Sequence, residues 1–173
     1  MFLKKIKLNT GFTLVEISTY ITIFGILAVG LVSFGLSISF LNKKIYVAQE
    51  VQTNAQIALN LISQKISSAS STITPLPNLA STSLILGMNI DQDLIITASS
   101  GIITLTSGTS SPVNITSQKV SVTNLIFSNL SASSTRASST KDSVKIEMTV
   151  EYRDAYSKEY EYSESFQTAV GIK

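Results

Sequence analysis

Residues 4–41 read KKIKLNTGFTLVEISTYITIFGILAVGLVSFGLSISFL, and they decide how the rest of the chain is organised. Lysines open the stretch, a lone glycine follows, and from Phe12 to Leu41 the one charged residue is Glu16. About 20 consecutive apolar residues are enough for a helix to cross the hydrocarbon core of a bilayer. The stretch therefore predicts a membrane-spanning helix, with an acid near its beginning that such a helix would ordinarily exclude.

The composition excludes several classes of site. The 173-residue chain contains no cysteine and no histidine, so disulfides, Cys/His zinc sites and Ser-His or Cys-His catalysis are ruled out. The net charge is +2, and no clustered basic face of the kind that nucleic acid requires is evident. The length suffices for one modest domain and a membrane anchor. We expect no cofactor and no enzymatic activity.

The basic residues Lys4, Lys5 and Lys7 precede the apolar run, as in a secretory signal or a signal anchor. The positive-inside tendency places them in the cytoplasm and sends the C-terminal domain outward. Lys43 and Lys44 flank the other end and weaken this asymmetry. The pattern predicts a single-pass protein of the cytoplasmic (inner) membrane with an extracytoplasmic C-terminal domain.

Two ordinary interpretations leave Glu16 unexplained. A cleaved signal peptide would have a short apolar core followed by small residues of the Ala-x-Ala kind, which are missing here. A plain anchor would tolerate the sequence, but a carboxylate costs about 2.5–3.5 kcal/mol at the centre of a membrane helix and less near an interface. Such an acid usually has a partner, and neither interpretation supplies one.

The residues Gly11-Phe12-Thr13-Leu14-Val15-Glu16 resemble the type IV prepilin signature, and the likeness extends over residues 4–40. The resemblance implies that a membrane aspartyl peptidase cuts between Gly11 and Phe12 and that the new amine of Phe12 is methylated. A glycine lets the backbone approach an active site closely. Glu16 lies one helical turn beyond Phe12, so its carboxylate could pair with the amine of a neighbouring subunit and favour assembly.

The resemblance also implies partners and a destination. The partners are the prepilin peptidase and methyltransferase, other pilin or pseudopilin subunits, an inner-membrane assembly platform and membrane lipid. DNA is a conceivable partner without support in the sequence. The filament would be a type IV pilus or a type II secretion-like pseudopilus at the cell surface. Many major pilins carry a proline where this chain has Gly30 to Gly35, which favours a minor subunit. Glycines there either let helices pack closely or are simply tolerated.

Beyond the membrane segment, apolar residues continue at intervals of three and four, and no proline occurs before Pro75. This spacing predicts an amphipathic continuation of the helix to about Ser70. Its predicted apolar face is made of Ile45, Ala48, Val51 or Gln52, Ala55, Leu59, Ile62, Ile66 and Ala69. Asn54 is assigned to the polar side.

After the prolines, short segments with alternating apolar residues predict strands. They are residues 83–88, 94–98, 102–106, 113–115, 119–130, 143–153 and 159–170, with residues 94–106 forming a hairpin. The predicted fold is α+β, with the long helix packed on an antiparallel β-sheet, and the resemblance implies that it is pilin-like. The predicted regions are a leader (1–11), a transmembrane or filament-core helix (12–41), an amphipathic helix half (42–74) and a Ser/Thr-rich β-sheet head (75–173).

Asp91 and Asp93 form the one close acid pair outside the C-terminal region, and they could bind calcium with backbone carbonyls. A polar turn between strands is the alternative. Carboxylate-pair glycosidase chemistry would need a substrate cleft that nothing here suggests.

The sequence thus predicts a minor pilin or pseudopilin, weakly similar to J-type minor pseudopilins in the order of its segments. The alternative is a membrane-anchored surface binding module, such as an adhesin or DNA-uptake receptor, that does not polymerise.

Overall fold

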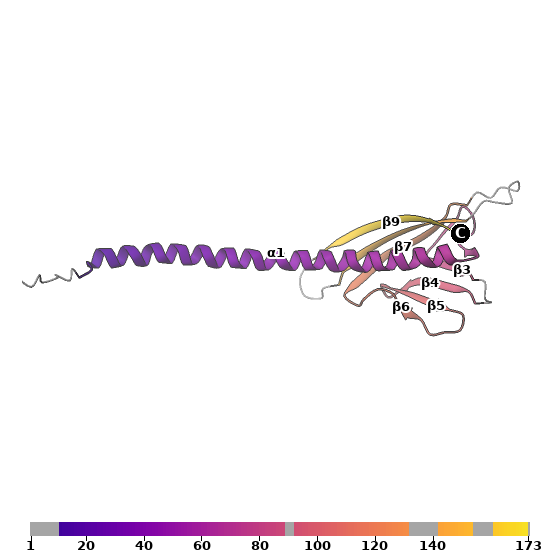
Figure 1. Ribbon diagram of the computed structural model, residues 1–173, viewed down its shortest axis with the longest axis horizontal. Coiled ribbons are helices and arrows are strands. Elements are labelled where there is room, and N and C mark those ends of the chain that lie inside the picture. Colours follow the sequence, from indigo (N-terminus) through magenta and orange to yellow (C-terminus); the bar gives the residue numbers. More distant parts are fainter. Residues whose placement is uncertain (1–10, 89–91, 132–141, 154–160, 173) are drawn as a thin grey trace, which may run out of the picture. The chain divides into compact units, whose positions relative to one another are not determined.

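The computed structural model describes residues 11–88, 92–131, 142–153 and 161–172. The chain divides into two compact units, Met1–Asn42 and Lys43–Lys173. The helix α1, Leu14–Ser68, begins in the first unit and ends in the second (Figure 1). It begins two residues after Phe12, the predicted start, and ends two residues before Ser70, the predicted end of the helical spacing. Thr13 precedes it, Lys65 occupies its last turn and no proline interrupts it, as a long uninterrupted helix requires.

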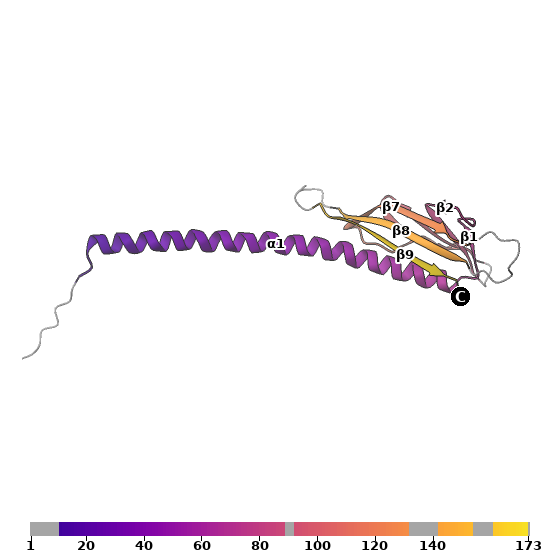
Figure 2. The same cartoon turned by 90° about the horizontal axis from the view of Figure 1, so that it is seen from above.

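Among the described residues of the second unit, nine strands follow α1 and form two antiparallel sheets. The strands are β1 Ser71–Thr74, β2 Ala80–Ser81, β3 Ser83–Gly87, β4 Leu94–Ser99, β5 Ile102–Ser107, β6 Val113–Asn114, β7 Val120–Asn129, β8 Ser143–Tyr152 and β9 Ser163–Gly171. The first sheet has the order β1-β3-β4-β5-β6, and the second has the order β2-β7-β8-β9. Figure 2 shows the second sheet beside the C-terminal half of α1.

The α+β prediction is confirmed, but the prediction of one sheet is wrong. Residues 71–74, expected at the end of the helix half 42–74, form β1, because α1 already ends at Ser68. Neither β1 nor β2 was predicted, since both are short, lack a clear apolar alternation and gain strand geometry by pairing with β3 and β7. Among the described strands, β1 and β3 to β6 pair with one another, and β2 and β7 to β9 pair with one another. No pairing links the two groups in the described part of the chain, so they form two sheets.

The predicted hairpin is confirmed in the ladder of β4 with β5. Ser99 lies opposite Ile102, so Ser100 and Gly101 alone make the turn. Both have positive φ, 52° and 76°, which matches the type I′ turn favoured between twisted antiparallel strands. The glycine at the second position accepts this backbone conformation without steric cost.

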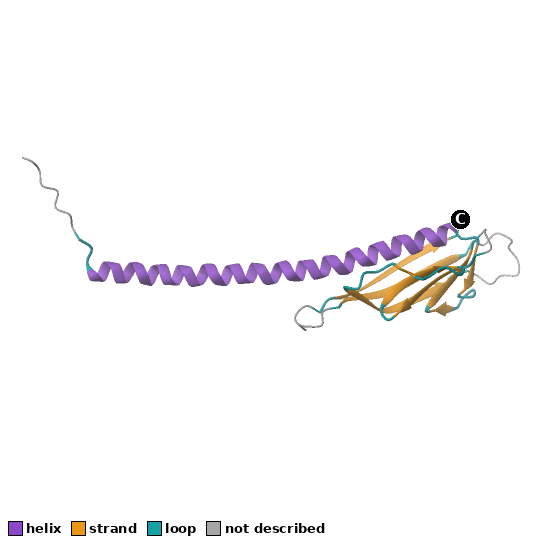
Figure 3. Ribbon diagram, turned by 90° about the horizontal axis from the view of Figure 1, so that it is seen from below, coloured by secondary structure: helices purple, strands orange, loops and turns teal. Residues whose placement is uncertain are grey.

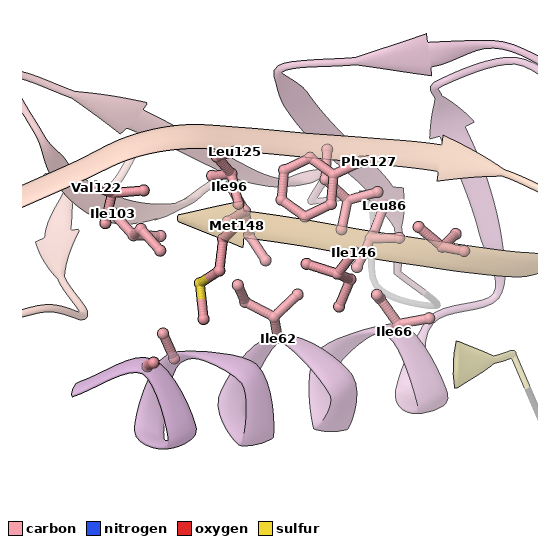
Figure 4. Close-up of a cluster of buried hydrophobic side chains, with 14 of the residues drawn as sticks. Ile62, Ile66, Leu86, Ile96, Ile103, Val122, Leu125, Phe127, Ile146 and Met148 are labelled. Atoms are coloured by element: carbon pink, nitrogen blue, oxygen red, sulfur yellow. The ribbon is translucent and has the colours of Figure 1, made fainter. Parts of the chain in front are cut away.

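The core of the second unit lies between the inner faces of the sheets and one face of α1. Figure 4 shows Ile62 and Ile66 directed from α1 toward Ile146, Met148 and neighbouring apolar side chains of both sheets. Burying one such side chain stabilises the fold by about 1.5–3 kcal/mol relative to leaving it in water.

The buried face of α1 differs from the predicted one at a few positions. Ile45 is 46% exposed, and Ala58 rather than Leu59 is fully buried. Asn54, assigned to the polar side, is 8% exposed. The sheets lie over one side of this half of α1 (Figure 3), and they meet the helix from Val47 onward.

Candidate functional site

The site that the sequence singles out lies at the first turn of α1. The Glu16 backbone N–H donates a hydrogen bond to Thr13 Oγ1 at 3.3 Å, and the Ile17 N–H donates to the Thr13 carbonyl oxygen at 3.2 Å. Thr13 is therefore the N-cap of α1, and its hydroxyl satisfies one of the helix's first free N–H groups. Glu16 stands three residues on, where a carboxylate is favoured by the positive end of the helix dipole.

The two residues at the expected cleavage point precede this cap. Gly11 and Phe12 lie outside the helix, and Phe12 is 71% exposed. A Cβ added to Gly11 would meet no atom within 4 Å. The Gly11–Phe12 peptide bond is thus exposed within the described chain and precedes a capped helix.

The Glu16 side chain is exposed, and its carboxylate has no hydrogen-bond or ion-pair partner among the residues that the structure describes. An unpaired carboxylate on an apolar helix is costly in lipid. The geometry therefore leaves Glu16 available to a cation from outside the described chain.

Around Glu16, the first half of α1 presents apolar side chains on every side. Large examples are Leu14 at 85%, Phe24 at 73% and Leu31 at 72% exposure. The helix is long and apolar enough to cross a membrane, and its most apolar window is not buried within the protein. A surface of this kind is stable only when lipid or other protein covers it.

Five hydroxyl side chains of this half are compatible with such an environment. Their hydroxyls donate to backbone carbonyl oxygens three or four residues earlier, at 2.8–3.1 Å, in Ser18, Thr19, Thr22, Ser37 and Ser39. A hydroxyl that is satisfied within its own helix costs little in hydrocarbon.

In the second unit, a polar network fastens α1 to the segment before β7. Asn54 Oδ1 accepts the Ser117 N–H at 2.9 Å, while Asn54 Nδ2 donates to the Glu50 carbonyl oxygen at 2.9 Å. Lys119 Nζ donates to Tyr46 Oη at 2.7 Å and lies 3.9 Å from Glu50 Oε2. The bond to Tyr46, followed by the charge of Glu50, raises the pKa of Lys119 above its ordinary value.

A second polar contact joins α1 to β9. Gln52 Nε2 donates to Glu164 Oε2 at 3.2 Å, and Tyr162 Oη donates to the same oxygen at 2.9 Å. The bond to Glu164, with a smaller contribution from burial, raises the pKa of Tyr162. Side-chain hydrogen bonds thus join α1 to the segment before β7 and to β9 of the second sheet.

Lys4, Lys5, Lys7 and Asp91 lie outside the described residues, and Asp93 is exposed. Among the described residues no group of three or more acidic side chains could hold a metal ion. The calcium prediction therefore gains no support from the described part of the chain.

A hollow of about 410 Å³ lies on the outer face of the second sheet. It is lined by Asn124, Glu147, Met148, Thr149, Ser165, Phe166 and Gln167. Glu147 is the one carboxylate of this lining, and Lys145 pairs with it at 2.7 Å. The hollow consequently lacks the two facing carboxylates of a glycosidase.

Comparison with protein-family models, with curated proteins and with solved structures gives no match to this chain.

The sequence analysis did not predict the structural roles of two residues, the N-cap Thr13 and the buried Asn54. Thr13 was quoted only as part of a signature, although Thr-Leu-Val-Glu also fits the capping-box pattern in which Ser or Thr is followed three residues later by Glu. Asn54 carried no such signal, because its role depends on Ser117, which is far away in the sequence.

Proposed function

We propose that this chain is a prepilin-like subunit that is cut between Gly11 and Phe12, is held in the inner membrane by α1 and is then assembled into a filament. Its work is structural, as a minor pilin of a type IV pilus or a minor pseudopilin of a secretion-like pseudopilus. The β-sheet head, residues 75–173, would present contacts to other subunits or to the surroundings.

The observation that carries the proposal is the arrangement around Glu16. An exposed, non-helical Gly11–Phe12 bond precedes a capped first turn, and one unpartnered carboxylate follows on an otherwise apolar helix. Cleavage would give Phe12 a free amine, which is positively charged near neutral pH. Pairing Glu16 with the Phe12 amine of a neighbouring subunit would compensate both charges in an apolar setting. Assembly would then be favoured in the one alignment of neighbouring helices that brings these two groups together.

The same helix would serve before and after assembly. In the membrane, lipid covers the exposed apolar side chains of α1, and in a filament the helices of other subunits cover them. Both environments are apolar, so the segment needs no refolding between them.

The N-terminal mass of the mature protein tests the proposal directly. We expect the purified chain to begin at Phe12, with one added methyl group, when it is expressed with a prepilin peptidase. A mature chain that keeps residues 1–11 or begins elsewhere would contradict the proposal.

Variants of Glu16 test the assembly step separately. Glu16→Ala and Glu16→Gln should still be cut before Phe12 but should fail to enter filaments, because the partner of the amine is lost. Thr19→Ala on the same helix is the matched control and should assemble normally. Unimpaired assembly of both Glu16 variants would mean that the acid has no part in assembly, and a chain that functions without polymerising would favour the anchored binding module.

A further inference from the structure

The strand β9 forms one end of the second sheet (Figure 2). It pairs with β8 from Ser163, opposite Glu151, to Gly171, opposite Ser143, and the register does not shift. No described strand pairs with its other side. A strand at the end of a sheet presents a row of unpaired backbone N–H and C=O groups on that side.

The hydrogen bonds at the two ends of the ladder show which residues of β9 face outward. The Tyr152 N–H donates to the Tyr162 carbonyl oxygen at 2.9 Å, and the Ile172 N–H donates to the Asp142 carbonyl oxygen at 2.8 Å. Successive residues of an antiparallel strand direct their backbone groups to opposite sides, so the even-numbered residues of β9 face β8. The odd-numbered residues face outward, and they are Ser163, Ser165, Gln167, Ala169 and Gly171.

This outward edge is open. All five odd-numbered residues are exposed, and their backbone groups have no hydrogen-bond partner among the described residues. Natural proteins protect such an edge by keeping it short, by placing Lys or Pro on it, or by a bulge. The nine residues of β9 include neither Lys nor Pro, and none of the five outward residues is charged.

The other sheet ends of the described strands are short or irregular. The strands β2 and β6 have two residues each. The strand β1 has four residues, and its pairing with β3 is irregular between Thr72 and Thr74. The Thr72 N–H also donates to Asp142 Oδ2 at 3.2 Å. Among the described strands, β9 is therefore the one long edge without protection.

The side chains of β9 indicate the chemistry of a strand that would fit beside it. Phe166 and Val170 pack against the core but remain partly exposed, whereas Met148 and Val144, opposite them on β8, are buried. An added strand would cover Phe166 and Val170 if it carried apolar residues at alternate positions.

A second copy in the same membrane does not fit this edge. The strand β9 runs in the same direction as the second half of α1, and its end lies near the end of the helix (Figure 1). Two identical edges pair in antiparallel directions across a two-fold axis. Such pairing would turn the two α1 helices in opposite directions, so two copies anchored side by side in one membrane cannot form it.

We propose that β9 accepts an extended segment of a different protein chain, with apolar residues at alternate positions, as a fifth strand of the second sheet. Backbone hydrogen bonds to the five outward residues would supply affinity, and the cover over Phe166 and Val170 would supply specificity. The exclusion of a second copy rests on the membrane-held state of the proposed function, but the open edge itself does not.

A peptide with the sequence of residues 162–172 is a suitable probe, because it lacks α1 and can approach β9 in the antiparallel direction. Placed with its Gln167 opposite Gln167 of the chain, it brings its Ala169 opposite Ser165, so the outward groups match. The measurement is amide hydrogen exchange of the full chain in detergent, followed by NMR. We expect the outward amides of Ser165, Gln167 and Ala169 to exchange about tenfold more slowly at a peptide concentration about ten times the Kd.

A matched pair of variants separates the backbone from the side chain. Gln167→Pro removes one outward N–H and no bond to β8, and we expect it to weaken peptide binding at least about tenfold. Gln167→Ala keeps the backbone groups and should bind the peptide as the unaltered chain does. Equal binding by the two variants would overturn the proposal.

A modified peptide gives a test that does not depend on the folding of a variant. The same peptide, methylated on the amide nitrogens of its positions 165, 167 and 169, cannot donate hydrogen bonds to the edge. We expect it to leave the exchange of the outward amides unchanged. Equal slowing by the methylated and the unmodified peptide, or no slowing by either, would overturn the proposal.

Cross-linking in membranes tests which chain occupies the edge, since the chain contains no cysteine of its own. Gln167→Cys on β9 should form no more disulfide dimer than Ser110→Cys, an exposed control between β5 and β6. An excess of dimer at Gln167→Cys would make a second copy the occupant and overturn the assignment to a different chain. Because the N-terminal mass is measured separately, failure of the peptide to bind a chain that begins at Phe12 would refute this inference and leave the proposed function standing.

Discussion

Asn54→Ala should destabilise the head more than any other replacement of a polar residue on the described part of α1. The Asn54 side chain is 8% exposed, accepts the Ser117 N–H at 2.9 Å and donates to the Glu50 carbonyl oxygen at 2.9 Å. The variant would leave the Ser117 donor without its partner in a partly buried place, which costs about 1–3 kcal/mol. Loss of the bond to Glu50 adds about 0.5–1.5 kcal/mol.

One effect acts in the opposite direction. Alanine favours the helix over asparagine by roughly 0.5 kcal/mol, so the net loss in the free energy of unfolding is about 2 kcal/mol. For a unit of about 130 residues, this loss corresponds to a melting temperature lower by roughly 7 °C.

Thermal unfolding of the full chain in detergent, followed by the near-ultraviolet circular dichroism of its tyrosines, measures this change. Most of the six tyrosines lie in the second unit, so the signal reports on the packing of the head. Gln56→Ala is the control, because Gln56 is exposed on the same helix without a partner in the described chain, and its effect should stay within about 0.5 kcal/mol. Equal shifts for Asn54→Ala and Gln56→Ala would refute the role of the network.

Three further outcomes follow from the contacts of the head. In a denaturant titration, Ile62→Ala should lower the free energy of unfolding by about 2–5 kcal/mol, because Ile62 is fully buried. Ile57→Ala is the control on the same helix; Ile57 is 51% exposed, so the change should be less than about 1 kcal/mol. The pKa values of Lys119 and Tyr162 are both raised in the folded state, so each group contributes stability that is fully present below about pH 10 and is lost as the pH rises through its folded-state value. The denaturation midpoint should therefore fall in alkaline solution, and Tyr162→Phe should reduce that fall; an unchanged pH profile of the variant would contradict the assignment. Gly101→Ala should cost about 1–2 kcal/mol, because φ is 76° there and a Cβ would crowd the neighbouring side chains, and a melting temperature equal to that of the unaltered chain would refute this.

Much of the secondary structure could be predicted from local pattern. The long apolar run and the three-and-four spacing to Ile66 predict one helix, and α1 is observed from Leu14 to Ser68. Alternation in Val144, Ile146, Met148 and Val150 predicts β8, where those four side chains are buried. Such patterns are readable because residues a few positions apart share a face of one element.

The finer features of the head were not predictable in this way. The strands β1 and β2 exist because β3 and β7 offer them free backbone groups. Asn54 reads as a surface residue between Thr53 and Ala55, and its burial is set by Ser117 on a segment distant in the sequence. Pairing and burial of this kind depend on which distant segments meet, and local spacing does not carry that information.

The sequence by itself determined that a membrane-compatible helix lies near the N-terminus, preceded by lysines and Gly11-Phe12 and carrying a single acid at Glu16. Hydrophobicity and helical spacing act over a few residues, so they can be read without a fold. Only the tertiary structure decided that the strands divide into two sheets, that Asn54 turns inward, and that the opposite face of the second half of α1 is left exposed. A face of a helix is known to be exposed only once the partner that covers the other face has been found.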